Sequence, residues 1–244
     1  MLLITAVGLV AAMGFLSVLD LGGLEHSMEL GFERLGADFL VVDRTAKVNL
    51  TQALLAVEPD TAALPAEVLE AASQLPQSIL VSPQRAVRGD AQFATSMGLS
   101  HGANIPLYGI DPAHDSTVQP WLDEQRGIDF QDGQVILGHR LRGRLGDRLR
   151  LQGRTFQIYG HLAASGVPSH EHGLFFTLSD LNNLIPSGDP DTLGINGLLV
   201  QAPAEFTVER LRFSLLAQLP DATVTGGRTP VSYTHLRAHE TVSD

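Results

Sequence analysis

The stretch "QVILGHRLRGRLGDRLRLQGRTFQIYGHL", residues 134–162, decides the fold class of this 244-residue chain. A short apolar run over residues 135–137 predicts a buried strand, and the residues after it predict one or two helical turns. Two segments then alternate apolar and polar side chains, and Gly153 lies near the turn between them, so they predict a β-hairpin. Four apolar side chains would share one face of that hairpin: Leu149, Leu151, Phe156 and Ile158.

Strand and helix patterns also stand on the N-terminal side of this hairpin. "DFLVVD" and "NIPLYGID" predict strands, and "LPAEVLEAASQLP" predicts a helix that begins near Pro65 and ends at Pro76. "SILVSPQRAVRG" predicts a strand in which Pro83 marks a sheet edge or a bulge, because proline has no N–H for a ladder bond.

A second set of elements follows the hairpin. "GLFFTLSDLNNLI" predicts a strand and a short helix that Ser179 could cap, and "INGLLVQAP" and "ATVTGG" predict further strands. "EFTVERLRFSLLAQLP" has the apolar stripe of an amphipathic helix. Together the patterns predict an α+β fold, with strand–helix–strand units near both ends and a mostly β insert between them.

The composition excludes several classes of protein. Hydrophobic residues make up 44% of the chain, which is typical of a globular protein rather than a disordered one. The formal net charge of −11 disfavours general nucleic-acid binding, since phosphate contacts need a positive field. The chain has no cysteine, which excludes disulfides, thiolate metal sites and cysteine nucleophiles.

Residues 1–19 carry no charge, and Asp20 is the first charged residue. At about 1.5 Å per residue such a helix spans roughly 28 Å, close to the hydrocarbon thickness of a bilayer. A buried core helix would show a polar stripe and a signal peptide would begin with basic residues, so a transmembrane helix fits best. Residues 20–36 predict an amphipathic stalk that continues this helix, with Gly22 and Gly23 as its softest point.

The order of these segments resembles a known family over roughly residues 1–229. Seven segments carry the resemblance: "RLGADFLVV", "LPAEVLEAASQLPQSILVSPQ", "PLYGIDP", "VQPWL", "GQVILGHRL", "LGDRLRLQGRTFQIYGHLAASGV" and "HGLFFTLSDLNNL". Their sequence is similar to the first membrane helix and large extracytoplasmic domain of the membrane subunits of MacB/FtsX-type ABC transporters. The chain departs from that pattern in its tight "HRLRGRLGDRL" segment, which the family usually has longer.

The resemblance implies a division of the chain into parts. Residues 1–36 would be the transmembrane and stalk helix. Residues 37–110 and 186–229 would form a porter-like α+β part, and residues 111–185 an inserted small α/β part. The family continues into three further membrane helices that this chain does not show, and residues 230–244 resemble a translated sequencing adapter. We therefore expect a permease fragment with an unstructured tail.

The resemblance also implies function and partners. The expected protein is a permease in the cell (inner) membrane with its main domain extracytoplasmic, which couples ATP hydrolysis by a partner to cargo export, extraction or signalling. Its partners would be a cytoplasmic ABC ATPase, a second permease copy, and a periplasmic adaptor or lipophilic cargo. The chain has no phosphate-binding G-x-x-x-x-G-K-[ST] motif, so the ATPase would be another chain. The alternative is a membrane-anchored extracytoplasmic binding or sensor domain.

"GVPSHEHGLFF", residues 166–176, raises the question of a metal site. His170 and His172 flank Glu171, and His161 lies upstream. A zinc site needs three or four converging ligands, and no spacing here forces these residues to converge. Pro168 and its neighbours favour a loop, so we expect a structural role, no metal or cofactor, and little loss of stability when both loop histidines are replaced.

Two further patterns have functional and ordinary interpretations. "GLSHG", residues 98–102, matches the G-x-S-x-G elbow of hydrolases with Ser100 as nucleophile, but the elbow needs a helix after it and a strand pattern follows. We therefore expect no enzyme, and a Ser100 hydrolase is the least favoured alternative. An arginine cluster could meet anionic headgroups or a carboxylate-bearing substrate, yet it is typical of a solvated surface. Its members are Arg140, Arg142, Arg144, Arg148, Arg150 and Arg154.

Overall fold

A computed structural model describes the following residues: 37–46, 57–76, 78–90, 105–189, 191–201, 216–217 and 222–226. The expected transmembrane and stalk helix (residues 1–36), most of the helix expected over residues 205–220 and the tail 230–244 lie outside these residues. Within the described part of the chain, no helix is long and apolar enough to cross a membrane.

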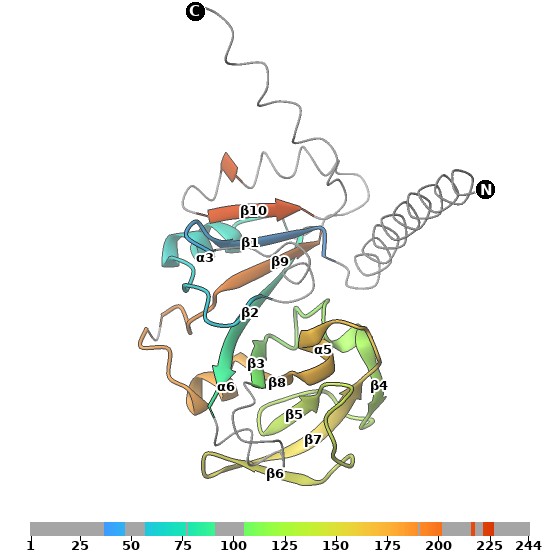
Figure 1. The fold of residues 1–244 in the computed structure, drawn as a ribbon. Helices are drawn as coiled ribbons and strands as arrows, with labels where there is room; N and C mark the ends of the chain where they lie inside the picture. Colours follow the sequence, from blue (N-terminus) through green and yellow to red (C-terminus); the bar gives the residue numbers. More distant parts are fainter. Residues whose placement is uncertain are drawn as a thin grey trace, which may run out of the picture.

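The structure is a mixed, sheet-dominated α/β fold (Figure 1). Its strands are β1 (Phe39–Asp43), β2 (Leu80–Gly89), β3 (Ile105–Ile110), β4 (Leu122–Gln125), β5 (Gln134–Leu137), β6 (Arg148–Leu151), β7 (Arg154–Leu162), β8 (Leu174–Thr177), β9 (Gly197–Gln201) and β10 (Ala222–Gly226). Its helices are α3 (Ala66–Ser73), the 3-10 turn η1 (Gln119–Trp121), α5 (Pro168–His172) and α6 (Leu178–Leu184).

The strands form one ten-stranded sheet in the order β10-β1-β9-β2-β3-β8-β5-β7-β4, with β6 paired to β7. The pairs β3–β8 and β5–β7 are parallel and the others are antiparallel. The strands predicted around β1, β2, β3, β9 and β10 are confirmed, as are helix α3 and the β6–β7 hairpin. The division into a porter-like part and an inserted part remains a prediction. The strands of both parts belong to this single sheet, so the sheet itself does not separate them.

Strand β2 joins the two ends of the sheet. Its residues Leu80 to Gln84 pair with β9, and its residues Gln84 to Gly89 pair with β3. Gln84 is thus the only residue of β2 that is paired on both sides. Pro83 lies opposite Leu198 of β9, just before the pairing with β3 begins, so the proline stands where β2 has one neighbouring strand. The prediction that Pro83 marks an edge therefore holds locally, although β2 as a whole is interior.

Asn196 extends the junction at the residue just before β9 begins. Its side-chain oxygen accepts a hydrogen bond from the N–H of Ala86 at 2.9 Å, and its side-chain nitrogen donates to the carbonyl of Ala86 at 2.8 Å. The same nitrogen also donates to the carbonyl of Thr61 at 3.3 Å. A side-chain amide thus replaces the missing strand beside Ala86 and satisfies both of its buried backbone groups.

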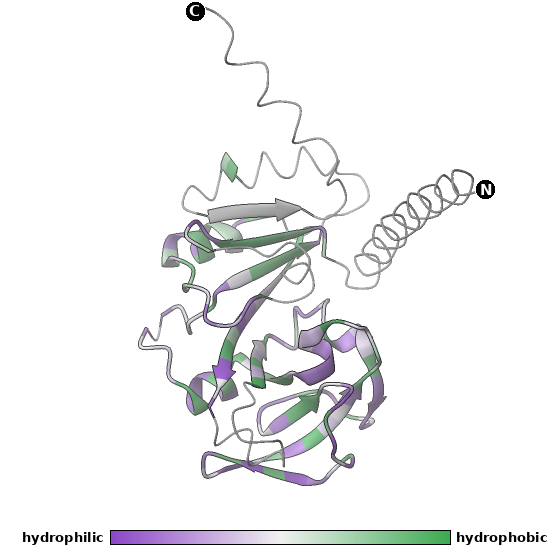
Figure 2. Cartoon of the chain, viewed as in Figure 1, coloured by the Kyte–Doolittle hydropathy of each residue, from purple (hydrophilic) through white to green (hydrophobic). Residues whose placement is uncertain are grey.

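Apolar side chains bury both faces of the sheet. On one face, α3 covers the β1 and β9 end and α6 covers the β3 and β8 end. The opposite face carries a single cluster that runs across both ends, from Leu40 and Leu199 through Ala86 to Tyr108 and Phe175. Figure 2 shows strands β1 and β5 in the green of hydrophobic residues and helix α5 mostly in the purple of hydrophilic ones. The continuous cluster makes the two ends parts of one core.

The helical turns predicted after β5 do not form. The segment between β5 and β6 consists of turns, because its two ends are bonded to other elements. The N–H groups of Gly138, His139 and Arg140 donate to carbonyls of α5 and of Gly173 at 2.8–2.9 Å, and Gly146 donates to Ile158 at 2.8 Å. Gly146 has a φ of +83°, outside the helical region. The residues left between these anchors are too few for a stable helix.

The cap of α6 also differs from the prediction. Thr177, not Ser179, is the N-cap residue, and its hydroxyl accepts a hydrogen bond from the N–H of Asp180 at 3.1 Å. Ser179 lies inside the first helical turn, where its N–H is among those that need an external partner.

Replacing Asn196 by Ala is expected to lower the free energy of unfolding by about 1–3 kcal/mol, because it leaves the N–H of Ala86 buried without its partner. Urea unfolding followed by circular dichroism measures this change. The exposed Asn183→Ala on α6 is the matched control and should change stability by less than about 0.5 kcal/mol. Equal stabilities of the two variants would show that Asn196 does not support the junction.

Candidate functional site

The segment that contains His170 and His172 is helical rather than a loop. Pro168 begins the one-turn helix α5, a position where its missing N–H costs nothing. The last carbonyls of α5 accept hydrogen bonds from the turn after β5: His170 from His139 and Glu171 from Arg140, each at 2.9 Å. The sequence-based expectation of a loose loop is therefore wrong, because the turn after β5 supplies the partners that hold this helix.

His170 belongs to the core. It is 1% exposed, and its ring lies against Trp121 and Phe175 with centroid distances of 5.7 and 5.6 Å. Nε2 lies 3.2 Å from the carbonyl oxygen of Thr117, so Nε2 carries the proton and donates. Nδ1 then accepts from the hydroxyl of Ser169 at 3.2 Å. Burial lowers the pKa of His170 below its usual value, and the imidazole is neutral in the folded protein.

Glu171 is held by three donors. One carboxylate oxygen accepts from the N–H groups of Ser165 and Gly166 at 2.9 and 3.0 Å, and the other accepts from the Arg140 guanidinium at 3.0 Å. Burial acts to raise the pKa of Glu171, but these hydrogen bonds outweigh it and the pKa lies below its usual value. The carboxylate is consequently engaged in closing the loop before α5 and is not directed at a ligand.

The four residues that suggested a metal site do not converge. His172 is exposed, whereas His161 lies elsewhere, with Nε2 at 3.1 Å from the carbonyl of Gly143. Across the described ranges there is no group of three or more histidine, aspartate or glutamate side chains that could hold a metal ion. The expectation that His170 and His172 are both dispensable for stability is wrong for His170, because its ring fills the core.

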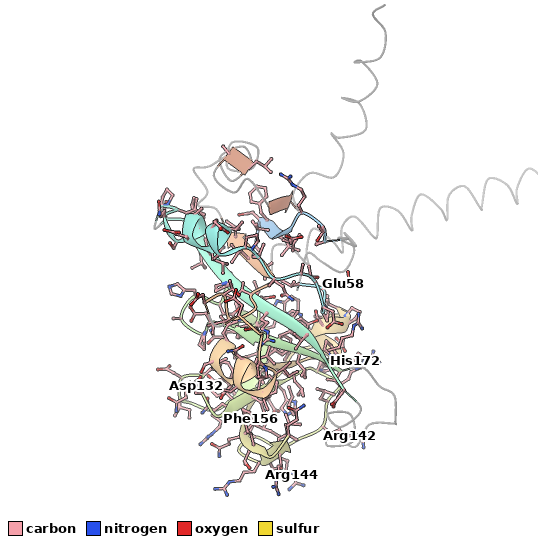
Figure 3. The ribbon with its side chains drawn as sticks, turned by 90° about the vertical axis from the view of Figure 1, so that its left-hand side faces the viewer. Glu58, Asp132, Arg142, Arg144, Phe156 and His172 are labelled. Atoms are coloured by element: carbon pink, nitrogen blue, oxygen red, sulfur yellow. The ribbon has the colours of Figure 1, made fainter. Side chains whose placement is uncertain are left out.

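A cleft of about 280 Å³ opens beside α5. It lies between the segment before α3, the outer part of β2, strand β3 and helix α5. Glu58 and His172 line it and lie on the same side of the molecule in Figure 3. The full lining is Val57, Glu58, Pro59, Arg88, Pro106, Tyr108, Val167, Pro168, Ser169 and His172.

The cleft has apolar walls and few polar groups. Tyr108 forms its floor, stacked on Phe175 at 5.0 Å, and burial raises the pKa of the phenol well above its usual value. Arg88 is paired with Asp60 at 2.8 Å, so the carboxylate of Glu58 and the imidazole of His172 are the polar groups left to meet a ligand. Such a mixture of apolar walls and a few polar groups suits binding of a small molecule or a chain segment.

A second depression, shallower and about 700 Å³ in volume, lies at the start of α6. It is acidic: Asp111 and Asp132 line it, and Asp132 accepts a hydrogen bond from Thr177. Asp180 lies close by and accepts from the N–H of Gly133 at 2.6 Å. Burial and the charge of Asp132 raise the pKa of Asp180. Asp132 thus serves the cap of α6, and Asp180 serves the turn before β5.

The structure also places the other candidates. All six clustered arginines are exposed, and Arg148 and Arg150 alternate with the half-buried Leu149 and the buried Leu151, so their solvated position is confirmed. Ser100 lies outside the described residues. Strand β3 begins at Ile105, so a strand stands where the hydrolase elbow needs a helix.

Sequence reasoning missed the cleft beside α5. Its walls come from four separate chain segments, and no local motif announces that they meet. The available signal was the position of three prolines that line the cleft. Pro59, Pro106 and Pro168 each stand at or near the start of an element or turn.

A family model described as "MacB-like periplasmic core domain" matches residues 1–218. The fold is similar to the periplasmic region of MacB from Actinobacillus actinomycetemcomitans, with a TM-score of 0.56 at 15% sequence identity, covering 80% of this chain and 91% of that one. The extracellular domain of the ABC-type transporter YknZ from Gram-positive bacteria gives a TM-score of 0.45 at 12% identity, covering 78% and 100% of the two chains. No curated protein matches the sequence.

The buried His170 predicts a pH dependence of stability. Its folded-state pKa is below the unfolded value of about 6.5, so its contribution is complete above that pH. As the pH falls below about 6.5, unfolding takes up a proton and the free energy of unfolding drops by up to about 1.4 kcal/mol per pH unit until the folded pKa is reached.

His170→Gln, which keeps hydrogen-bonding capacity but does not titrate, should show a shallower loss between about pH 7 and pH 5. His172→Ala, at an exposed position, is the control and should follow the wild-type curve. Urea unfolding across this range measures both. Identical slopes for wild type and His170→Gln would contradict the assignment of a neutral, buried imidazole.

Proposed function

Because this chain belongs to the family of MacB-like periplasmic core domains, which are parts of ABC transporter permeases that work with ATPases, we propose that it couples ATP hydrolysis by a partner to work outside the cytoplasm. That work is cargo export, extraction or signalling across the cell envelope. The family match over residues 1–218 is the observation that carries the proposal, since it spans the apolar N-terminal segment as well as every strand of the described sheet except β10.

The arrangement of β1 supports a role in transmitting motion. This strand follows the expected stalk directly and is paired on both sides, with β9 and with β10. Its apolar side chains are buried on both faces of the sheet: Phe39, Leu40, Val41 and Val42. A displacement at residue 37 would therefore act on a strand that is paired on both sides and would pass through β9 to β2 and β3. A domain that is only tethered to the membrane would not need its first strand to be paired on both sides and buried on both faces.

The proposal includes the partners and the location. The chain lies in the cell (inner) membrane through its N-terminal segment, and the described domain lies outside the cytoplasm. It pairs with a second permease copy and with a cytoplasmic ABC ATPase, and it meets a periplasmic adaptor or a lipophilic cargo. The chain itself catalyses no reaction and holds no cofactor, and it does not bind nucleic acid.

The cleft beside α5 favours a second candidate function. Its apolar walls with Glu58 and His172 at the rim would suit a membrane-anchored binding or sensor domain that works without an ATPase. A hydrolase that uses Ser100 remains the least supported reading, because a strand follows where a helix is needed.

The first test is purification of the protein from its native membrane with a tag at its C-terminal end. An ATPase subunit that carries a phosphate-binding G-x-x-x-x-G-K-[ST] motif should co-purify at a fixed ratio, because the permease needs it for work. A membrane preparation from cells that express only the tag is the control. Purification without any ATPase would favour the sensor.

The second test concerns the stalk. Inserting two glycines between Glu29 and Leu30 should soften a helix there and rotate its register by about 200°. The described domain should fold normally because its core begins at Ala37. The ATPase activity of the partner should lose its dependence on this chain.

The matched control inserts two glycines between Ser187 and Gly188, in a surface segment away from the stalk, and should leave coupling intact. If coupling survives the stalk insertion as well, the stalk is a tether and does not transmit motion.

A further inference from the structure

Positive charge is concentrated at one end of an acidic protein. Residues 140–154 hold six arginines and one aspartate, Asp147, in a chain whose net charge is −11. These residues form the loop before β6, strand β6 and the hairpin turn, at the end of the molecule opposite β1 and β10 (Figure 1). Figure 3 shows Arg142 and Arg144 projecting from this end.

The arginines of this end are available to a partner. Arg140 is paired with Glu171 at 3.0 Å. The other five make no ion pair with any described residue, and all five side chains are exposed: Arg142, Arg144, Arg148, Arg150 and Arg154. Leu145, in their midst, is 38% exposed, one of the few large apolar side chains of the described surface that face solvent.

Among the described strands, β6 is an edge strand, and its open edge lies next to these side chains. It pairs with β7 on one side, and no described strand pairs with its other side. The direction of its backbone groups follows from Gln157, the partner of Arg148. The N–H of Gln157 donates to the carbonyl of Gly133, away from β6, so Arg148 and Gln157 form a non-hydrogen-bonded pair.

The same alternation makes Arg150 and Thr155 a non-hydrogen-bonded pair, two residues along. The N–H and C=O groups of Arg148 and Arg150 therefore point to the open edge. The side chains of these two arginines face solvent on one face of the strand, and Leu149 faces the core on the other. The edge thus combines outward-pointing backbone N–H and C=O groups with a positive face and an apolar face.

We propose that β6 is a docking edge for an extended, carboxylate-rich protein segment, which adds to the sheet as a strand beside Arg148 and Arg150. Alternate side chains of the incoming strand would be acidic and meet the arginines, and the others would be apolar and continue the face of Leu149. Guanidinium groups suit this partner because they bind carboxylates with two parallel hydrogen bonds. The proposal goes beyond the proposed function and holds for a transporter or a sensor alike.

A protein segment fits this edge better than a phosphate polymer. The edge presents both N–H donors and C=O acceptors, and a phosphate oxygen can satisfy the donors but not the carbonyls. The exposed Leu145 beside the arginines also needs an apolar partner, which a peptide side chain supplies. Arginines on an edge strand can also serve only to prevent self-pairing, and the experiment separates that role.

The experiment measures fluorescence anisotropy of the full chain in detergent with a labelled peptide in which glutamate alternates with valine. The wild type should bind it. Arg150→Glu should weaken binding by about fivefold and Arg148→Glu with Arg150→Glu by well over tenfold, since each reversal replaces an attraction by a repulsion. Arg44→Glu, the same charge change at the opposite end of the fold, should leave binding unchanged. Arg150→Gln gives a second, milder variant in case charge reversal disturbs folding.

Two probes separate strand addition from simple charge attraction. The same peptide, N-methylated on the amides that would donate hydrogen bonds to β6, should bind at least about tenfold more weakly, because it cannot form the ladder. Inorganic polyphosphate should compete poorly at equal charge. Equal binding of the methylated peptide, or stronger binding of polyphosphate, would overturn strand addition. No binding of any acidic peptide would leave the arginines as edge protection only and refute the proposal.

Discussion

The structure depends on one strand that belongs to both ends of the sheet. Strand β2 pairs with β9 along its first half and with β3 along its second, and the two pairings overlap at Gln84 alone. So short an overlap would be a weak joint if backbone pairing were the only connection. It is reinforced by Asn196, which bonds both backbone groups of Ala86, and by Gln84, which donates to the hydroxyl of Thr117 at 2.7 Å. One continuous apolar cluster lies beneath these bonds.

The candidate site follows from that joint. The loop that receives Gln84 also presents the Thr117 carbonyl to His170, so the position of α5 and of the cleft is tied to β2. Glu58 reaches the cleft from the segment before α3, while His172 reaches it from α5 at the other end of the sheet. A change in the angle between the two ends would therefore alter the cleft. Under the proposed function, motion that enters at β1 would reach the cleft by this route.

Much of this fold was accessible from the sequence, and the reasons are local. The apolar runs of β1 and β9 and the alternation of the β6–β7 hairpin are periodic signals that burial on two faces or one face requires. The failures came from contacts between distant residues. No local pattern reveals that α5 supplies the carbonyls for His139 and Arg140, or that His170 fills the core beside Trp121. The family resemblance was confirmed by the match over residues 1–218, which local periodicity alone could not have given.

The central claim is that the two ends of the sheet form one cooperative unit through β2. Native-state hydrogen exchange in increasing urea tests it most directly, because it reports the opening free energy of each strand separately. The account predicts that amides of β1 and β9 and those of β3 and β8 open with the same free energy and the same dependence on urea. Opening free energies that differ by more than about 1 kcal/mol between the two groups would show separate units and contradict the claim.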